Sequence, residues 1–349
     1  MKTVVITGIH GQDGGYLAKL LLSKNYTVVG IARRTSLPND ERIKNLYYNK
    51  SFVIEYADVT DVGSLYKILN KYNPDEIYNL AAQSHVKESF EQPKYTFDVT
   101  FGGVLNILEW LRYYSPKTKL FQASSSEMFG SCFNVNLNYE YDNDGSQIVT
   151  EECYQDENTT MIPNSPYAVA KLAAHNLVKM YRNSYNLFAC CGIMFNHESP
   201  KRGEQFVTRK ISKYIAGLKV DGFKEKLKLG NLEASRDWGF AEDTMRAAWM
   251  ILQNVEPIDY IVSTGETHSV REFLIEAAKR IGLDDKDIFR LVSIDDSLKR
   301  PLEVSYLKGC SKKIRDELGW EPKVDFKNLV KLMVDEDIKL KEENKYGRV

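Results

Sequence analysis

Short apolar runs alternate with longer amphipathic segments over roughly the first 195 residues of the chain. The runs are rich in β-branched and aromatic residues and are short, which predicts strands. Between them, apolar residues recur at helical spacing. Strands that alternate with helices predict a parallel, doubly wound α/β sheet of the Rossmann type. The predicted strands are 2–7, 26–31, 51–56, 76–80, 119–123 and 187–194, and the clearest helices are 16–23, 62–72 and 103–114.

The alternation becomes irregular after residue 195, where turn-rich stretches appear. We expect a smaller C-terminal α/β domain there, which completes a cleft beside the sheet. Amphipathic helices are expected in it at 270–281 and 327–334. The predicted division assigns 1–195 to the first domain, with 239–265 packing back on it, and assigns 196–238 and 266–345 to the second.

The stretch 131–164 fits neither pattern, because it is polar, aromatic and loop-like. A connection of this length inside a compact domain is typically functional. A lid over the cleft, an interface element and a mobile excursion all remain open.

A glycine-rich turn, GIHGQDG, lies between the first predicted strand and the first predicted helix. Glycines there let the backbone approach a pyrophosphate, and the helix N-terminus favours its charge. The strand–turn–helix setting therefore predicts dinucleotide binding, with a purely structural turn as the alternative. The candidate cofactor-binding residues of the turn are Gly8, Gly11, Gln12, Asp13 and Gly14.

Basic and hydroxyl side chains follow the second strand, in Arg33-Arg34-Thr35-Ser36. NAD-binding proteins usually place an acidic residue here for the ribose 2′-hydroxyl. Guanidinium groups instead suit a 2′-phosphate. NADP is therefore predicted as the cofactor, held by Arg33, Arg34 and Ser36, and the alternative is a solvated basic turn. Further cofactor candidates after the third and fourth strands are Asp58, Val59, Leu80, Ala81, Ala82 and Ser84, and Tyr95 is a candidate that could equally be a packing residue.

Two later segments carry the candidate chemistry: Ser124-Ser125-Ser126-Glu127, and Tyr167 with Lys171. Tyr and Lys four residues apart share one helix face, so the ammonium can lie beside the phenol. A unit charge about 4 Å away at an effective dielectric of about 20 contributes roughly 4 kcal/mol, or about 3 pK units at most. Tyr167 is therefore expected to have a lowered pKa and to accept a proton. Glu127 supplies a second proton-transfer group, which a simple alcohol oxidation does not need.

The composition is that of an ordinary globular protein, with 43% hydrophobic and 27% charged residues and a net charge of −1. This balance gives no reason to expect nucleic acid or an anionic membrane as a partner. No apolar run reaches the roughly 18 residues of a membrane span, and the N-terminus does not resemble a signal peptide. The five cysteines form no C-x-x-C pair, which predicts reduced thiols in the cytoplasm and no metal site.

With these segments in hand, the chain resembles the extended short-chain dehydrogenase/reductase family, and within it the GDP-mannose 4,6-dehydratases. The resemblance covers roughly residues 3–322. The Tyr167/Lys171 pair indicates only the superfamily, whereas the longer motifs are narrower. Those motifs are TGIHGQDGGYLAKLLL, NLAAQSHV, SSSEMFG, SPYAVAK, FNHESPKRGEQFVTRKI and LGNLEASRDWG.

The resemblance implies a GDP-sugar substrate and a division of labour among the candidates. Tyr167 would take the proton of the sugar 4-hydroxyl, Lys171 would hold the cofactor ribose and lower the phenol pKa, and Ser125 would hydrogen-bond the 4-oxygen. Glu127 would remove the C5 proton and assist the loss of water from C6. It also implies a homo-oligomer, a dimer or a tetramer. The remaining implied positions are His197 and Arg202 at the cofactor, and Ser84, Asn196, Arg236, Arg300 and Glu303 at the substrate.

Several alternatives stay open at this point. Arg236, Arg300 and Glu303 could form a surface or interdomain ion pair instead of binding substrate. Ser125 stands where the family usually has Thr, and the stretch 131–164 is longer than usual beside the expected sugar end, so a GDP-manno-heptose is an alternative substrate. A nucleotide-sugar 4-epimerase shares the Tyr/Lys pair but needs no carboxylate at Glu127. A non-catalytic nucleotide-sugar sensor would need none of the four catalytic candidates.

Overall fold

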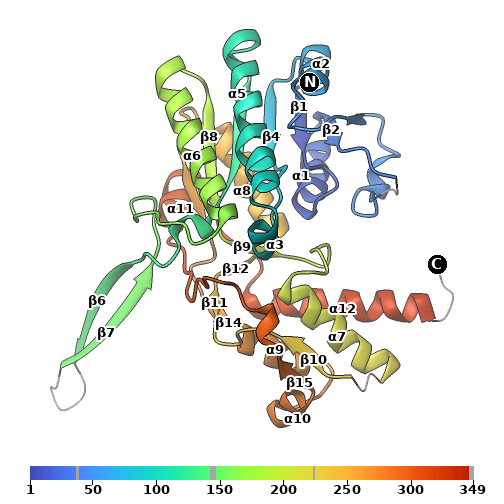
Figure 1. Ribbon diagram of the computed structural model, residues 1–349, viewed down its shortest axis with the longest axis vertical. Helices are drawn as coiled ribbons and strands as arrows, with labels where there is room; N and C mark the ends of the chain where they lie inside the picture. The colour runs from blue at the N-terminus through green and yellow to red at the C-terminus, as the bar shows by residue number, and fades with distance from the viewer. Residues whose placement is uncertain (37–38, 142–146, 223–224, 346–349) are drawn as a thin grey trace.

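The computed structural model describes residues 1–36, 39–141, 147–222 and 225–345. Its largest element is a seven-stranded sheet in the order β13-β8-β5-β4-β1-β2-β3 (Figure 1). Every neighbouring pair in this sheet is parallel. The strands are β1 (Thr3–Thr7), β2 (Thr27–Ala32), β3 (Phe52–Tyr56), β4 (Glu76–Asn79), β5 (Lys119–Ser125), β8 (Ala189–Met194) and β13 (Tyr260–Val262). The predicted doubly wound α/β class is confirmed.

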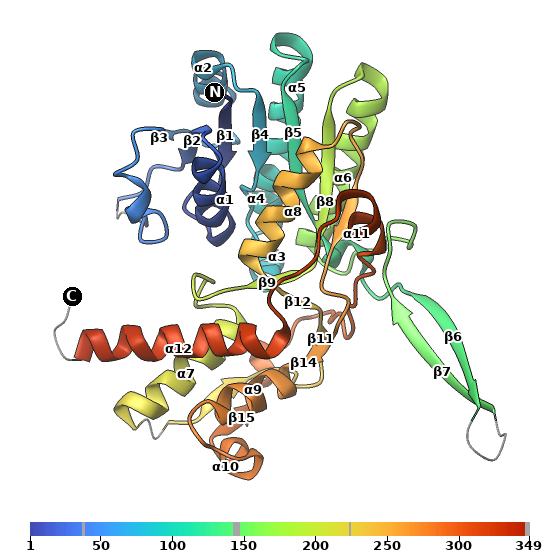
Figure 2. The same ribbon diagram turned by 180° about the vertical axis from the view of Figure 1, so that it is seen from behind.

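Helices cover both faces of this sheet, as the two opposite views show (Figures 1 and 2). Helices α2 (Val62–Tyr72), α5 (Gly103–Tyr114) and α6 (Pro166–Tyr185) contribute to one apolar core. Helices α1 (Gln12–Ser23) and α8 (Ala241–Gln253) contribute to the core on the other face. The sheet is therefore buried on both sides, which explains why its strands read as continuous apolar runs.

The second lobe packs around the aromatic residues Trp238, Phe273 and Phe326. Three small two-stranded sheets help to connect and build it. Its helices are α7 (Val207–Asp221), α9 (Val270–Lys279), α10 (Asp285–Arg290) and α12 (Phe326–Lys345). The small sheets pair β9 (Asn196–Glu198) with β12 (Trp238–Phe240), β10 (Leu227–Leu229) with β15 (Val292–Ile294), and β11 (Ser235–Arg236) with β14 (His268–Ser269).

The predicted division into domains stays a prediction. Within 266–345, which it assigns to the second domain, helix α11 (Lys312–Leu318) lies against the first lobe beside β13. Ile314 and Trp320 are buried in the core that α1 and α8 share. A single helix of seven residues carries too little periodic signal to be placed from sequence.

The predicted loop-like stretch 131–164 is also different in the structure. It contains an antiparallel hairpin of β6 (Asn134–Tyr141) and β7 (Gln147–Tyr154), which projects from the body of the molecule (Figures 1 and 2). Val135, Leu137 and Tyr139 alternate with asparagines along β6, which is the period of a strand. The expectation of a loop overlooked this alternation. Where the excursion begins and ends, Gly130 and Ile162 form an isolated β-bridge.

In the part of the chain that the structure describes, no helix has both the length and the hydrophobicity needed to cross a bilayer.

Candidate active site

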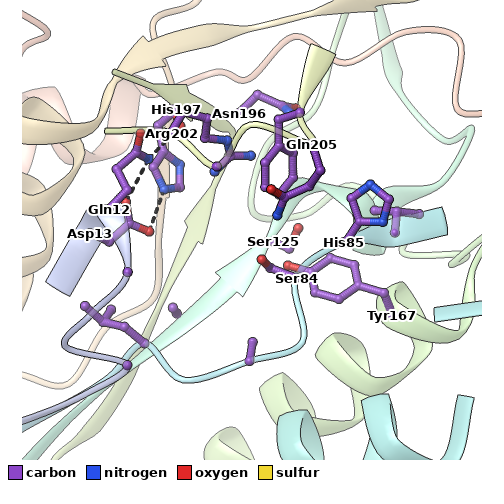
Figure 3. A pocket seen from close by; sticks show the side chains of 18 of the residues that line it. Gln12, Asp13, Ser84, His85, Ser125, Tyr167, Asn196, His197, Arg202 and Gln205 are labelled. Atoms are coloured by element: carbon purple, nitrogen blue, oxygen red, sulfur yellow. Dashed lines mark hydrogen bonds and ion pairs between the residues drawn. The ribbon is translucent and has the colours of Figure 1, made fainter. Parts of the chain in front are cut away.

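A cleft of about 1120 Å³ lies at the carboxyl edge of the large sheet and continues into the second lobe. The segments that follow β1, β4, β5 and β8 all line it. Because carboxyl ends of parallel strands meet at one edge, residues distant in sequence converge there. Figure 3 shows Ser84, Ser125 and Tyr167 beside one another, with Asp13 and His197 farther along the same pocket.

The catalytic candidates come together in the interior of this cleft. Ser125 is the last residue of β5, and Glu127 lies in the short helix η3 (Ser126–Phe129) directly after it. Tyr167 and Lys171 occupy the first turns of α6, where Ser165 caps the helix by accepting a hydrogen bond from the Ala168 amide at 3.1 Å. The four candidate residues are only 4–8% exposed and all line the cleft.

The electrostatics of the Tyr167/Lys171 pair differ from the expectation. Burial raises the pKa of Tyr167 to about 12, and the hydrogen bond with Ser125 offsets this only in part. Burial likewise lowers the pKa of Lys171 to about 8. Lys171 Nζ donates to the carbonyl oxygen of Ala123 at 2.7 Å and lies 5.8 Å from the centre of the Tyr167 ring. The expected lowering of the phenol pKa is therefore wrong for this arrangement, because desolvation outweighs a cation that points elsewhere.

The glycine turn packs against its surroundings too closely for larger residues. Gly8 has a φ of 70°, and a Cβ there would lie 2.9 Å from the Ala81 amide nitrogen. A Cβ at Gly14 would lie 2.6 Å from the Gly8 carbonyl oxygen. Because only glycine fits at these positions, no side chain covers the backbone of the turn between β1 and α1. A pyrophosphate could therefore approach that backbone closely. Gly11 lines the same part of the cleft.

Two polar residues after the turn join α1 to the strand β9. His197 Nε2 and Asp13 Oδ2 are 2.9 Å apart, and Gln12 Nε2 donates to the His197 carbonyl oxygen at 3.1 Å (Figure 3). Burial alone would lower the pKa of His197, but the Asp13 carboxylate raises it above its usual value. Burial alone would raise the pKa of Asp13, but His197 and Arg202 lower it. These residues therefore form an ion pair that fixes the entrance of α1 beside the cleft.

The basic turn after β2 contributes one arginine to the cleft. Arg33 lines it and donates a hydrogen bond to the Tyr95 hydroxyl, and Tyr95 lines it as well. The Arg34 guanidinium instead stacks over the Tyr56 ring at 4.5 Å from its centre. Neither Arg34 nor Ser36 belongs to the residues that line the cleft. Of the three residues predicted to bind a 2′-phosphate, the structure thus brings only Arg33 into the cleft.

The other cofactor candidates line the same cleft. Asp58 accepts hydrogen bonds from the Thr60 amide and hydroxyl at 2.9 and 2.8 Å, which fixes the turn after β3. Arg202 lies 3.1 Å from the Glu198 carboxylate. The candidates that line the cleft after β3, β4 and β8 are Asp58, Val59, Leu80, Ala81, Ala82, Ser84, His197 and Arg202.

On the second-lobe side, the predicted substrate residues form a charged group. Arg300 Nη1 donates to Glu127 Oε1 at 3.1 Å and lies 3.7 Å from Glu303 Oε1. Arg236 Nη2 donates to the same Glu303 oxygen at 3.1 Å. The alternative of an interdomain ion pair is therefore present, although all these residues and Asn196 also line the cleft.

Several cleft residues carried no signal that singled them out. His85 caps helix α3 (Val86–Glu91), and its ring packs edge-on against Phe206 at 5.7 Å. Burial and the nearby Arg300 lower the pKa of His85. The segment 201–210 belongs to one of the longer family motifs, yet nothing in its residue types alone distinguishes Gln205 or Phe206. Other cleft residues that were missed are Lys87, Lys210 and Lys228. Among the described residues, no cluster of three or more His, Cys, Asp or Glu side chains could hold a metal ion.

Comparison with known proteins bears on the same segments. The family model described as GDP-mannose 4,6 dehydratase matches residues 5–333. GDP-mannose 4,6 dehydratase 2 of Arabidopsis thaliana is 48% identical over 99% of this chain and 89% of its own length. GDP-mannose 4,6 dehydratase of Homo sapiens is 43% identical over 98% of this chain and 93% of its own length.

Solved structures with lower identity share the fold. The dTDP-glucose 4,6-dehydratase of Bacillus anthracis, in complex with NAD, superposes with a TM-score of 0.79 at 20% identity over 99% of this chain and 98% of that one. RMD of Pseudomonas aeruginosa, complexed with NADPH, gives a TM-score of 0.73 at 21% identity over 97% of this chain and 100% of that one. At these identities the likeness supports the architecture of the sheet and second lobe.

Proposed function

The chain belongs to the GDP-mannose 4,6-dehydratase family, and from that membership we propose that it removes water from GDP-mannose to give the 4-keto-6-deoxy sugar nucleotide. One observation supports this more than any other. The carboxylate of Glu127 lies in the same buried group as Ser125, Tyr167 and Lys171. That group contains both a partner for the sugar 4-hydroxyl and a separate base for the C5 proton.

The proposed roles follow from the positions of the side chains. Tyr167 accepts the proton of the sugar 4-hydroxyl while Ser125 donates a hydrogen bond to the 4-oxygen. The phenol must first be ionised. Lys171 lies on the same helix face, and its ammonium can stabilise the phenolate once it leaves the Ala123 carbonyl oxygen. Once C4 is a ketone, the proton on C5 becomes acidic. Glu127 removes it and returns a proton to the hydroxyl that leaves C6 as water.

The cofactor is proposed to be a nicotinamide dinucleotide, and more specifically NADP. When bound, its nicotinamide would accept the hydride from sugar C4 and return it to C6. The bare glycine turn, Asp13 with His197, and the small residues at Leu80–Ala82 would hold it. Arg33 is the support for NADP over NAD, because it lines the cleft where a 2′-phosphate would meet it.

A 4-epimerase would need the Tyr167/Lys171 pair but would remove no C5 proton. Glu127 would then have no reaction to perform, so the dehydratase is favoured. For the sugar, the long stretch 131–164 no longer favours a GDP-manno-heptose, because none of its described residues lines the cleft. GDP-mannose is therefore the proposed substrate.

The test is mass spectrometry of GDP-mannose and GDP-manno-heptose, each incubated separately with the protein and NADP. Loss of one water from GDP-mannose is the expected result. Faster water loss from the heptose would reassign the sugar within the same reaction. An intact mass for both, with cofactor bound, would contradict the dehydratase and favour a different nucleotide-sugar reaction.

Two further proposals concern the setting of the enzyme. All five cysteines are free thiols, which supports a reducing compartment such as the cytoplasm. Val135, Leu137 and Tyr139 are 48–57% exposed along one face of β6, which supports a homo-oligomer, a dimer or a tetramer. Sedimentation of the purified protein measures the second point directly.

A further inference from the structure

An ion pair crosses the cleft between the two lobes. Glu127 belongs to η3 beside the large sheet, whereas Arg300 belongs to the segment after η4 (Asp296–Leu298) in the second lobe. Arg300 Nη1 and Glu127 Oε1 are 3.1 Å apart. The proposed base of the reaction is therefore already bound to a guanidinium.

The group around this pair is nearly balanced in charge. Arg300 and Arg236 face Glu127 and Glu303, and Arg236 donates to Glu303 at 3.1 Å. The Glu127 and Arg236 side chains are 9% and 7% exposed, so water compensates them poorly if a partner is lost. Tyr167 adds no charge here while burial keeps its pKa raised.

The two partners of the pair differ in their freedom to move. Glu127 is held on a short helix, where its own amide nitrogen donates to Ser125 Oγ at 3.3 Å. Arg300 sits in a segment without regular secondary structure, and its side chain is 26% exposed. If the pair opens, the arginine is therefore the partner that moves.

We propose that the diphosphate of the incoming nucleotide sugar draws Arg300 away from Glu127, so that the base becomes free only when substrate is bound. This inference rests on the proposed function, since it assumes that the diphosphate reaches the second-lobe arginines. A diphosphate is an anion of higher charge than a carboxylate and accepts bidentate hydrogen bonds from guanidinium. It therefore competes with a single carboxylate for Arg300. Glu127 remains on its helix, with its lone pairs released for the C5 proton.

The exchange makes a prediction about GDP binding, which requires no turnover. In the native protein GDP must break the Arg300–Glu127 pair before it gains the arginine. Glu127→Gln removes that competitor, so GDP should bind about fivefold more tightly. Simple repulsion between the carboxylate and the phosphates would also tighten binding, so a double-mutant cycle is needed to separate the two.

The experiment is isothermal titration with GDP on four proteins: the native chain, Glu127→Gln, Arg300→Gln and the double variant. The gain from Glu127→Gln should appear when Arg300 is present and vanish in the Arg300→Gln background. Arg236→Gln is the matched control, because this arginine feels the Glu127 charge but donates its hydrogen bond to Glu303. In the Arg236→Gln background the gain from Glu127→Gln should persist.

An equal gain from Glu127→Gln with and without the Arg300 guanidinium would overturn the proposal and leave only charge repulsion. No gain in either background would overturn it as well. Arg300→Lys, which keeps the charge, should retain part of the gain and guards against a folding defect in Arg300→Gln. These results are independent of the water-loss assay, so the exchange can fail while the dehydratase stands, and the reverse.

Discussion

Two neighbouring regions of the chain, the catalytic segments and the β6–β7 hairpin, behave in opposite ways. The hairpin lies in sequence between Glu127 and Tyr167, yet these two residues are buried in one cleft and the hairpin projects from the body (Figure 1). The bridge between Gly130 and Ile162 holds the two ends of the excursion together. An insertion between two cleft residues therefore need not enter the cleft when its two ends are bridged to each other.

The largest expected effect comes from a substitution in the cleft, at Glu127. Glu127→Gln keeps the size of the side chain but removes the proposed base for the C5 proton. Dehydration of GDP-mannose should fall on the order of 10²- to 10⁴-fold, with cofactor binding retained. The measurement is water loss by mass spectrometry, alongside a cofactor titration.

The control makes the same substitution on the hairpin. Glu151 is an exposed carboxylate of β7, and Glu151→Gln should leave turnover unchanged. Full activity in Glu127→Gln would remove this residue from the mechanism. Lost cofactor binding in the same variant would show damage to the site instead.

The second prediction concerns Lys171 and pH. Because burial raises the pKa of Tyr167 to about 12, the phenolate fraction rises with pH, and the rate should rise with it. The rise should be less steep above about pH 8, because burial lowers the pKa of Lys171 to about 8 and its charge is lost there. Lys171→Met removes the cation that we propose to favour the phenolate. The rate at neutral pH should fall on the order of 10²-fold, and its rise should move to higher pH.

The pH profile of kcat measures this, and Lys179→Met is the matched control on the exposed side of the same helix. Its profile should coincide with that of the native protein. A Lys171→Met profile that is lower at every pH but unshifted would mean that the lysine acts only by binding.

The fold and site features that could be predicted from the sequence are those carried by periodic patterns or motifs. Contacts between side chains distant in sequence could not be predicted. The sheet, its flanking helices and the convergence of the catalytic candidates followed from apolar periodicity and from motifs. The direction in which Lys171 points did not, because helical spacing gives a shared face but not the carbonyl of Ala123, which comes from a strand of the sheet. The Arg300–Glu127 pair joins residues 173 positions apart, and no spacing rule reaches that far.

The hairpin and helix α11 were missed for a different reason. Asparagines on one face of β6 read as loop residues, although their alternation with Val135 and Leu137 is that of a strand. Helix α11 is short, and only tertiary contacts assign it to the first lobe. The asparagine-rich composition of β6 hid its strand pattern, and the short length of α11 gave too little periodicity to place it.

A third prediction concerns Arg33, which is exposed like the hairpin but lines the cleft. Arg33 lies at the surface yet lines the cofactor side, so Arg33→Ala should weaken NADP about tenfold and NAD much less. Fluorescence titration with each cofactor measures the ratio. Arg34→Ala is the matched control, because Arg34 stacks on Tyr56 outside the cleft. Equal losses for both cofactors in Arg33→Ala would contradict the 2′-phosphate assignment.

The smallest expected effect is on the hairpin itself. Replacing residues 134–154 by a short glycine linker removes the projecting strands but keeps Ser131, whose hydroxyl oxygen accepts a hydrogen bond from Asn164 at 3.1 Å. Because no described residue of the excursion lines the cleft, kcat and KM for GDP-mannose should stay within about twofold, which is the scale of surface changes away from a site. The same variant is assayed with GDP-manno-heptose. A selective loss of heptose turnover would show that the hairpin reaches the sugar after all, and the contrast between the two regions would then fail. Unchanged kinetics together with a changed sedimentation coefficient would instead assign the exposed apolar face of β6 to contacts between copies of the chain.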